Sequence, residues 1–185
     1  MFSKLPLLLL PLLLLSCSST RHYYILTPSG KAPSHQGKGI GIGPVTIADY
    51  LVEKPYVVFQ SSPNRMEISD LQEWAGDLRS NFTRVLGTNL GRRMNTGNIR
   101  SYPWDRKNEL QYQVTVDLSQ FHGTSDGDAI LEASWRAYSL PGGRLITTQS
   151  TTLLEPMTED GFDALVAAQS RLVDQLAAEI AAKLR

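Results

Sequence analysis

Apolar residues recur at helical spacing in two long stretches of this chain, and this pattern constrains the fold more than any other feature. Each stretch predicts an amphipathic helix that must bury one face. Segments before and between the stretches place apolar residues at every second position, which predicts strands. The order strands, long helix, strands, long helix predicts a single α/β sandwich domain with a mixed, largely antiparallel sheet and two long amphipathic helices over one face. The apolar positions of the two stripes are Leu71, Trp74, Leu78, Phe82, Val85, Leu86, Leu90 and Met94, and Phe162, Leu165, Val166, Leu172, Val173, Leu176, Ala177, Ile180 and Leu184.

Polar residues indicate where the first helix begins and ends. Gln72 follows Ser69 by three residues, a spacing typical of a capping box, so we expect the helix to open at Ser69. Arg92 and Arg93 suit the negative end of the helix dipole, and the Asn-Thr-Gly of residues 95–97 ends the helix. The second helix is expected over residues 160–184.

The expected strands are separated by segments rich in Gly, Pro, Ser and Asn. A Pro-Gly-Gly turn joins the last two strands, so the last three are expected to form an antiparallel meander. Residues 49–52 are expected to be extended or to form a short turn. The expected strands cover residues 23–26, 39–47, 56–60, 65–68, 99–104 (a short strand and turn), 111–118, 129–140 and 145–154.

Glycines alternate with other residues from Gly37 to Gly43, just before Pro44. A phosphate-binding loop would need backbone amides and a following helix N-terminus. Pro44 has no amide hydrogen, and Ile40 and Ile42 favour a strand. We therefore expect a strand with a bend or bulge at Gly43-Pro44, or a close approach of another segment to the glycines.

The amino-terminal segment has the pattern of a secretory signal peptide. One basic residue, Lys4, precedes an apolar run over residues 5–15, and Ser16 is a small residue before Cys17. The apolar run is shorter than the roughly 20 residues that cross a bilayer. Cys17 is the only cysteine of the chain, so no disulfide within the chain is expected.

The ending Leu14-Leu15-Ser16-Cys17 resembles the lipobox of bacterial lipoproteins. That resemblance implies cleavage before Cys17, a diacylglycerol on its thiol and a further acyl chain on the new amino group. The expected organisation is therefore a lipoprotein signal peptide over residues 1–16, a lipidated tether over 17–22 and one domain over 23–185. Ser18 follows the cysteine where Asp would imply retention in the inner membrane, so the outer membrane, facing the periplasm, is expected. The alternative is a secreted protein, although the Ala-x-Ala-like cleavage pattern is absent.

Composition and motifs predict neither an enzyme nor a nucleic-acid-binding protein. The chain has 18 basic and 18 acidic residues, and this near-neutral balance argues against a nucleic-acid surface. His22, His35 and His122 are not spaced as a metal pair, and no Gly-x-Ser-x-Gly motif occurs. Asp126 and Asp128 lack the spacing of a calcium loop and favour a hairpin loop. No catalytic residue, metal ligand or cofactor is predicted.

Two aromatic residues, Tyr102 and Trp104, flank a proline in a segment expected to be a loop. Exposed aromatic side chains often anchor protein partners. Partial burial against the edge of the sheet explains the same pattern. We keep both interpretations, with Tyr102 and Trp104 as candidate partner contacts.

The order of several short motifs resembles the ABC-type transport auxiliary lipoprotein family, most closely its PqiC-type members. The motifs are Cys17, residues 23–26 (Tyr-Tyr-Ile-Leu), residues 42–45 (Ile-Gly-Pro-Val) leading into 49–51 (Asp-Tyr-Leu), and the pair Trp74-Ala75. The resemblance implies an anticodon-binding-domain-like α/β fold. It also implies a non-enzymatic outer-membrane lipoprotein that docks or scaffolds a periplasm-spanning MCE-domain protein in intermembrane lipid transport. A ring-like homo-oligomer is expected because MCE proteins form rings. Cys17 is the one residue whose role carries over.

Three other functions remain open at this point. The domain could carry lipid directly in an apolar pocket between helix and sheet. It could assemble a different outer-membrane complex, or act as a periplasmic hydrolase.

Overall fold

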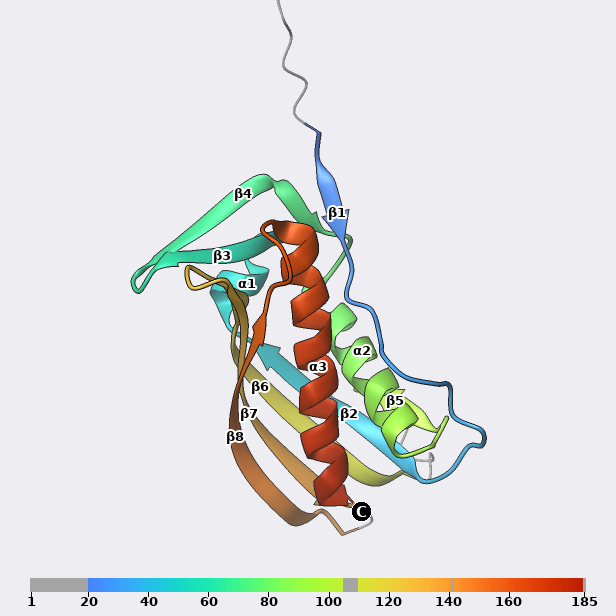
Figure 1. Cartoon of the computed structure of the whole chain (residues 1–185). Helices are drawn as coiled ribbons and strands as arrows, with labels where there is room; N and C mark the ends of the chain where they lie inside the picture. Colours follow the sequence, from blue (N-terminus) through green and yellow to red (C-terminus); the bar gives the residue numbers. More distant parts are fainter. Residues whose placement is uncertain (1–19, 105–109, 141, 185) are drawn as a thin grey trace, which may run out of the picture.

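Eight strands form one mixed sheet in the part of the chain that the computed structural model describes, residues 20–104, 110–140 and 142–184. Helices α2 and α3 lie side by side across one face of this sheet (Figure 1). The single α/β domain with a mixed sheet and two long helices is confirmed. In chain order the elements are β1 (His22–Tyr24), β2 (Gly39–Ile47), α1 (Asp49–Val52), β3 (Tyr56–Ser62), β4 (Arg65–Trp74), α2 (Leu78–Arg93), β5 (Ile99–Ser101), β6 (Leu110–Thr124), β7 (Asp128–Ser139), β8 (Arg144–Pro156) and α3 (Phe162–Leu184).

Strand β6 is the centre of the sheet. One of its edges pairs with β2 near its start and with β3 near its end, both in parallel. The other edge pairs with β7, and β7 with β8, in long antiparallel ladders. The predicted meander is therefore confirmed. On the far side of β3, β4 pairs antiparallel with β3 and parallel with β1, which brings the start of the described chain to this end of the sheet (Figure 1).

The predicted start of the first helix at Ser69 is wrong. Residues 69–74 are the end of β4, and α2 begins at Leu78. Asp77 is the N-cap, and its carboxylate accepts a hydrogen bond of 2.6 Å from the backbone amide of Ser80. Tertiary pairing overrides the local pattern, because β4 gains backbone partners on both sides from β1 and β3. Trp74, which fitted the helical stripe, is buried and stacks on Phe121 instead.

Strand β6 continues to Thr124, well beyond the predicted end at residue 118. Its register with β7 shifts between Leu118 and Gln120. This bulge changes which residues face the core, so Leu118 and Phe121 are both buried despite their odd spacing. The predicted end at residue 118 assumed a strict alternation of buried and exposed residues. The bulge interrupts this alternation, although the strand continues to Thr124. Residues 49–52, expected to be extended or a short turn, form the one-turn helix α1.

The bend predicted in the second strand is confirmed. Strand β2 includes the glycines, and its register with β6 shifts between Ile42 and Val45. The predicted close approach is also present, because a Cβ on Gly41 would lie 2.8 Å from the Trp104 ring. Ile40 and Ile42 are fully buried on the helix side of the sheet.

Two glycines of α2 lie against the segment that follows the helix, residues 96–99. A Cβ on Gly87 would lie 2.9 Å from the Ile99 side chain, and a Cβ on Gly91 would lie 2.7 Å from the Thr96 carbonyl oxygen. These glycines weaken an isolated helix by about 1 kcal/mol each. In the folded domain they allow a backbone approach that any side chain would prevent.

The core fills the space between the sheet and the two helices, as the stripes predicted. Full burial of each aliphatic or Phe side chain contributes about 1.5–3 kcal/mol. The largest fully buried side chains include Phe82, Leu86 and Leu90 of α2, Leu165 of α3, and Leu118, Phe121, Leu131 and Trp135 of the sheet.

The opposite face of the meander is polar in its middle. In β6 and β7 the buried positions alternate with exposed or half-buried ones such as Thr115, Asp117, Ser134 and Arg136. Apolar side chains lie on this face toward its two ends, where Leu154 pairs with Ile130 and Leu145 pairs with Tyr138; Leu154 and Leu145 are 56% and 50% exposed.

Candidate functional site

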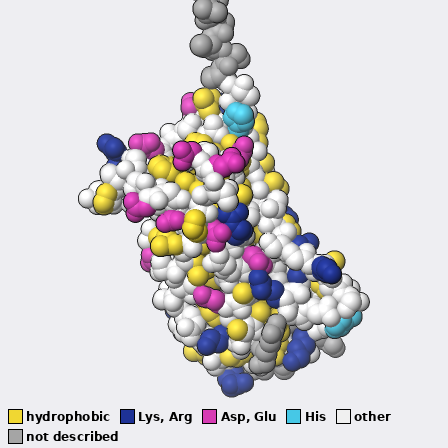
Figure 2. Space-filling model, viewed as in Figure 1, with side chains coloured by type: hydrophobic (Ala, Val, Ile, Leu, Met, Phe, Trp, Pro, Cys, Tyr) yellow, Lys and Arg dark blue, Asp and Glu magenta, His cyan; other side chains and the backbone are white. Residues whose placement is uncertain are grey.

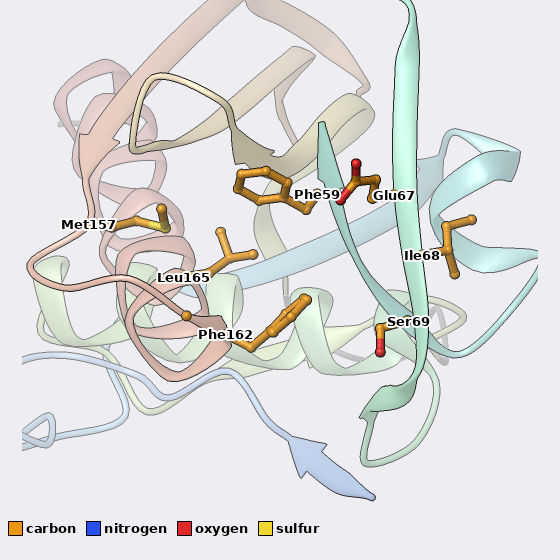
Figure 3. A pocket seen from close by; sticks show the side chains of 8 residues that line it. Phe59, Glu67, Ile68, Ser69, Met157, Phe162 and Leu165 are labelled. Atoms are coloured by element: carbon orange, nitrogen blue, oxygen red, sulfur yellow. The ribbon is translucent and has the colours of Figure 1, made fainter. Parts of the chain in front are cut away.

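A pocket of about 480 Å³ opens between the β3–β4 hairpin and the first turn of α3 (Figure 3). Its floor and walls are mainly apolar, and Glu67 and Ser69 of β4 supply polar groups. The side chains of Phe59, Met157, Phe162 and Leu165 surround the hollow in Figure 3, whereas Ile68 points away from it. The lining residues are Phe59, Glu67, Ile68, Ser69, Met157, Gly161, Phe162 and Leu165.

The floor of the pocket depends on a glycine in the central strand. Phe59 of β3 is in register with Gly123 of β6. A Cβ on Gly123 would lie 2.6 Å from the Phe59 ring and 3.2 Å from the Leu165 side chain. The missing side chain therefore makes room for Phe59 and Leu165 to lie together. On the opposite strand of the hairpin, Glu67 pairs with Phe59 and stands beside the ring.

The start of α3 forms one wall. Gly161 has a φ of +111°, a conformation that favours glycine, and its carbonyl accepts a 3.1 Å hydrogen bond from the Leu165 amide. Leu165 is buried, whereas Phe162 is half-buried, with its ring centroid 6.4 Å from that of Tyr24 in β1. Met157 closes the next side, and its amide donates a 2.9 Å hydrogen bond to the Gly127 carbonyl.

Acidic side chains predominate at this end of the molecule, where a Lys or Arg side chain also stands at the left, and most of the Lys and Arg side chains on this face lie toward the opposite end (Figure 2). Around the pocket, Glu67 lies on β4, and Glu159 and Asp160 precede α3; all three are exposed. Burial, together with the nearby Asp163 carboxylate, raises the pKa of Tyr24 above its usual value. The apolar pocket therefore has an acidic surrounding surface.

The same end exposes apolar side chains on β1, β4 and the segment after β1. Tyr23 is 61% exposed, Ile25 51%, Met66 36% and Ile68 52%. Scattered apolar residues on a surface are ordinary, but several at one end of a domain suit contact with another apolar phase.

The pocket lining does not include the two candidate partner contacts, Tyr102 and Trp104. Cys17 lies outside the described residues. Tyr102 and Trp104 follow the edge strand β5, with ring centroids 5.4 Å apart in an edge-to-face arrangement. Trp104 is half-buried over Gly41, whereas Tyr102 is 57% exposed. Partial burial against the sheet edge thus describes Trp104, and Tyr102 retains the exposure that a partner contact requires.

Sequence reasoning offered an apolar pocket between helix and sheet as one alternative, but it identified none of the residues that line the pocket. Phe162 and Leu165 were expected in the core stripe of the last helix, and Phe59 belonged to a predicted strand. No motif links these residues, because they meet only when the hairpin, β6 and α3 have packed together.

Residues 20–104, 110–140 and 142–184 contain no group of three or more His, Cys, Asp or Glu placed to hold a metal ion. His122 is fully buried, with Nδ1 3.0 Å from the Gly123 carbonyl oxygen and Nε2 3.2 Å from Gln120 Oε1. Burial lowers its pKa. Among the helices in these same segments, none has the length and apolar character needed to span a bilayer.

Comparisons with known proteins give consistent results. The chain is 26% identical to the intermembrane transport lipoprotein PqiC of Escherichia coli K12, over 93% of this chain and 92% of that protein, and equally to PqiC of Shigella flexneri. A crystal structure of an uncharacterised protein matches 90% of this chain and 99% of its own, with a TM-score of 0.75 and 22% identity. A protein of Xanthomonas campestris matches 86% of this chain and 92% of its own, with a TM-score of 0.65 and 14% identity. The model of the ABC-type transport auxiliary lipoprotein component matches residues 24–181. The chain therefore belongs to the ABC-type transport auxiliary lipoprotein family.

Proposed function

We propose that this protein is a lipid-anchored component of an intermembrane lipid transport system, attached to the outer membrane through acyl chains on Cys17 and facing the periplasm. In this role it docks or scaffolds a periplasm-spanning MCE-domain protein. The main support is that transport lipoproteins match nearly the whole chain, and that the chain belongs to their family. These relatives are named for transport, and no enzymatic activity is proposed.

The direction of the chain suggests how the domain is oriented. The described chain begins beside β1, at the end that also carries the pocket (Figure 1). Residues 17–21 separate Cys17 from β1 and can span at most about 17 Å when extended. An anchor at Cys17 would therefore hold this end near the membrane. The end of α3 and the β7–β8 turn would face away, toward a partner that spans the periplasm (Figure 1).

Two surfaces suit the proposed partners. Tyr102 is exposed beside edge strand β5, and we propose that it contacts the MCE-domain protein. Strand β8 has 13 residues and pairs only with β7 within the described residues, so its outer edge is open for strand pairing. A ring of identical copies, which we propose for the assembly, could use such an edge.

Affinity capture of the acylated protein from host membranes in mild detergent tests the proposal. An MCE-domain protein should co-purify, and Cys17→Ala should release the protein from the outer-membrane fraction. Tyr102→Ala should reduce the captured partner several-fold. Tyr23→Ala is the matched control, because Tyr23 is a similarly exposed tyrosine at the other end of the domain.

Capture of no MCE-domain protein, with the protein itself intact and acylated, would contradict the docking role. Mass analysis that finds an unmodified Cys17 thiol in protein from the host would contradict the anchor.

A further inference from the structure

We propose that the pocket between the β3–β4 hairpin and α3 binds one acyl chain of a membrane phospholipid whose headgroup ends in an ammonium. This inference rests on the proposed transport function, which places the domain at a lipid bilayer. It adds a binding site, a ligand class and a headgroup preference to that function.

The lining matches an alkyl chain. The pocket presents carbon and sulfur surfaces, which require no hydrogen bonds from a ligand (Figure 3). These surfaces belong to Phe59, Met157, Phe162 and Leu165. The volume of about 480 Å³ lies within the usual range of small-molecule sites. Apolar surface of this kind is best covered by an apolar group, since water gains no hydrogen bonds there.

Polar groups stand on one side of the hollow. Residues of β4 alternate between the two faces of the strand, so Glu67 and Ser69 face the pocket while Ile68 points away (Figure 3). A ligand with an apolar tail and a polar head matches this division. The tail would lie against Phe59 and Leu165, and the head would remain near Glu67 at the exposed rim.

The location gives access to membrane lipid. The pocket lies at the end where β1 begins, within the short reach of residues 17–21 from the proposed anchor. Exposed apolar side chains such as Tyr23 and Ile25 occupy the same end. A phospholipid leaving the bilayer would meet the pocket while the domain remains anchored.

The charges around the pocket select the headgroup. Glu67, Glu159 and Asp160 are exposed carboxylates on the hairpin and on the loop before α3. They attract an ammonium and repel the net negative charge of an anionic lipid. The N-terminal end of α3 favours anions, but Asp163 in its first turn already complements that dipole. The balance favours a zwitterionic phospholipid such as phosphatidylethanolamine over phosphatidylglycerol.

Photo-crosslinking of the full acylated chain tests this inference. The protein is reconstituted in vesicles of equal parts phosphatidylethanolamine and phosphatidylglycerol, with a benzophenone amino acid in place of Met157 or of Tyr23. Tyr23 is the matched probe, because it lies at the same end but outside the pocket. Phospholipid adducts identified by mass should be at least about fivefold more abundant at the Met157 probe, since a pocket retains its ligand.

A side chain that fills the pocket should lower the yield of the phospholipid adduct at the Met157 probe. Ser69→Trp places a ring in the hollow and should lower the Met157 adduct about fivefold, while Ser150→Trp on the outer face of β8 should leave it unchanged. Thermal melts of both variants verify folding. If Ser69→Trp fails to fold, the ratio of adducts at the Met157 and Tyr23 probes decides alone.

The preference for one headgroup is measured as the ratio of phosphatidylethanolamine to phosphatidylglycerol in the same adducts. Phosphatidylethanolamine should exceed phosphatidylglycerol about threefold at about 20 mM salt and approach parity at about 0.5 M salt, because these charges are exposed and screened. Glu67→Gln with Asp160→Asn should remove the preference at low salt.

Several outcomes would overturn the inference. Equal phospholipid adducts at the Met157 and Tyr23 probes would indicate mere proximity to the bilayer. Adducts at the Met157 probe to another protein, or to the protein's own acyl chains, would assign a different occupant. An excess of phosphatidylglycerol would refute the headgroup preference. Binding of the MCE-domain protein is measured in a separate affinity-capture experiment. A failure of docking can therefore be distinguished from a failure of lipid binding.

Discussion

Gly91 lies inside helix α2, yet we predict that replacing it with alanine destabilises the protein. Helix propensity alone predicts a gain of about 0.5–1 kcal/mol for Gly→Ala. In the folded domain, however, the new Cβ would lie 2.7 Å from the Thr96 carbonyl oxygen and 2.9 Å from the Ile99 side chain. The first of these atoms belongs to the backbone and cannot rotate away. Overpacking of this kind costs about 1–3 kcal/mol, so the net loss should be about 1–2 kcal/mol.

Urea denaturation followed by circular dichroism measures this effect. The loss should appear as a lower midpoint at an unchanged slope, and as a melting temperature lower by about 4 °C. Thr88→Ala in the same helix is the control: its hydroxyl donates a hydrogen bond to the Arg84 carbonyl within the helix, so a change below about 0.5 kcal/mol is expected. If Gly91→Ala equals or exceeds the parent in stability, the argument that α2 needs glycine for its close approach is wrong.

Two further predictions concern buried polar groups. Burial lowers the pKa of His122 below about 6.5, so the unfolded chain takes up this proton first as the pH falls. The free energy of unfolding should therefore decrease as the pH drops below about 6.5, and His122→Gln should flatten that slope between urea melts at about pH 7.5 and 5.5; an unchanged slope would exclude His122 as its source. Thr151 Oγ1 accepts a 3.1 Å hydrogen bond from Trp135 Nε1 and donates one of 2.7 Å to Glu179. Thr151→Val, which keeps the shape but loses the hydroxyl, should cost about 1–3 kcal/mol in the same assay, whereas Thr151→Ser should cost clearly less; a loss from Thr151→Ser larger than that from Thr151→Val would mean that the methyl group, not the hydrogen bonds, matters most.

Part of the candidate site could be predicted from local pattern, and part could not. The strand with Phe59 and the helix stripe with Leu165 both follow from periodicity, which reports the face that a residue turns toward the core. The pocket itself depends on distances between β3, β6 and α3. It also depends on Gly123, whose missing side chain has meaning only beside Phe59. Periodicity contains no such distances, so an apolar pocket between helix and sheet could be named as a possibility, but its place and its lining residues could not be predicted.

The sequence by itself determined the single α/β domain, the closing antiparallel meander and the long last helix, because period and turn residues are local properties of the chain. Tertiary structure alone determined the secondary structure of residues 69–74. These residues carry a helical stripe and a capping-box spacing, yet they form the end of β4 because β1 and β3 supply hydrogen-bond partners on both sides. Tertiary structure also gave Gly87 its role, since a glycine that weakens a helix locally allows α2 to pack against Ile42 of β2 and Ile99 of β5.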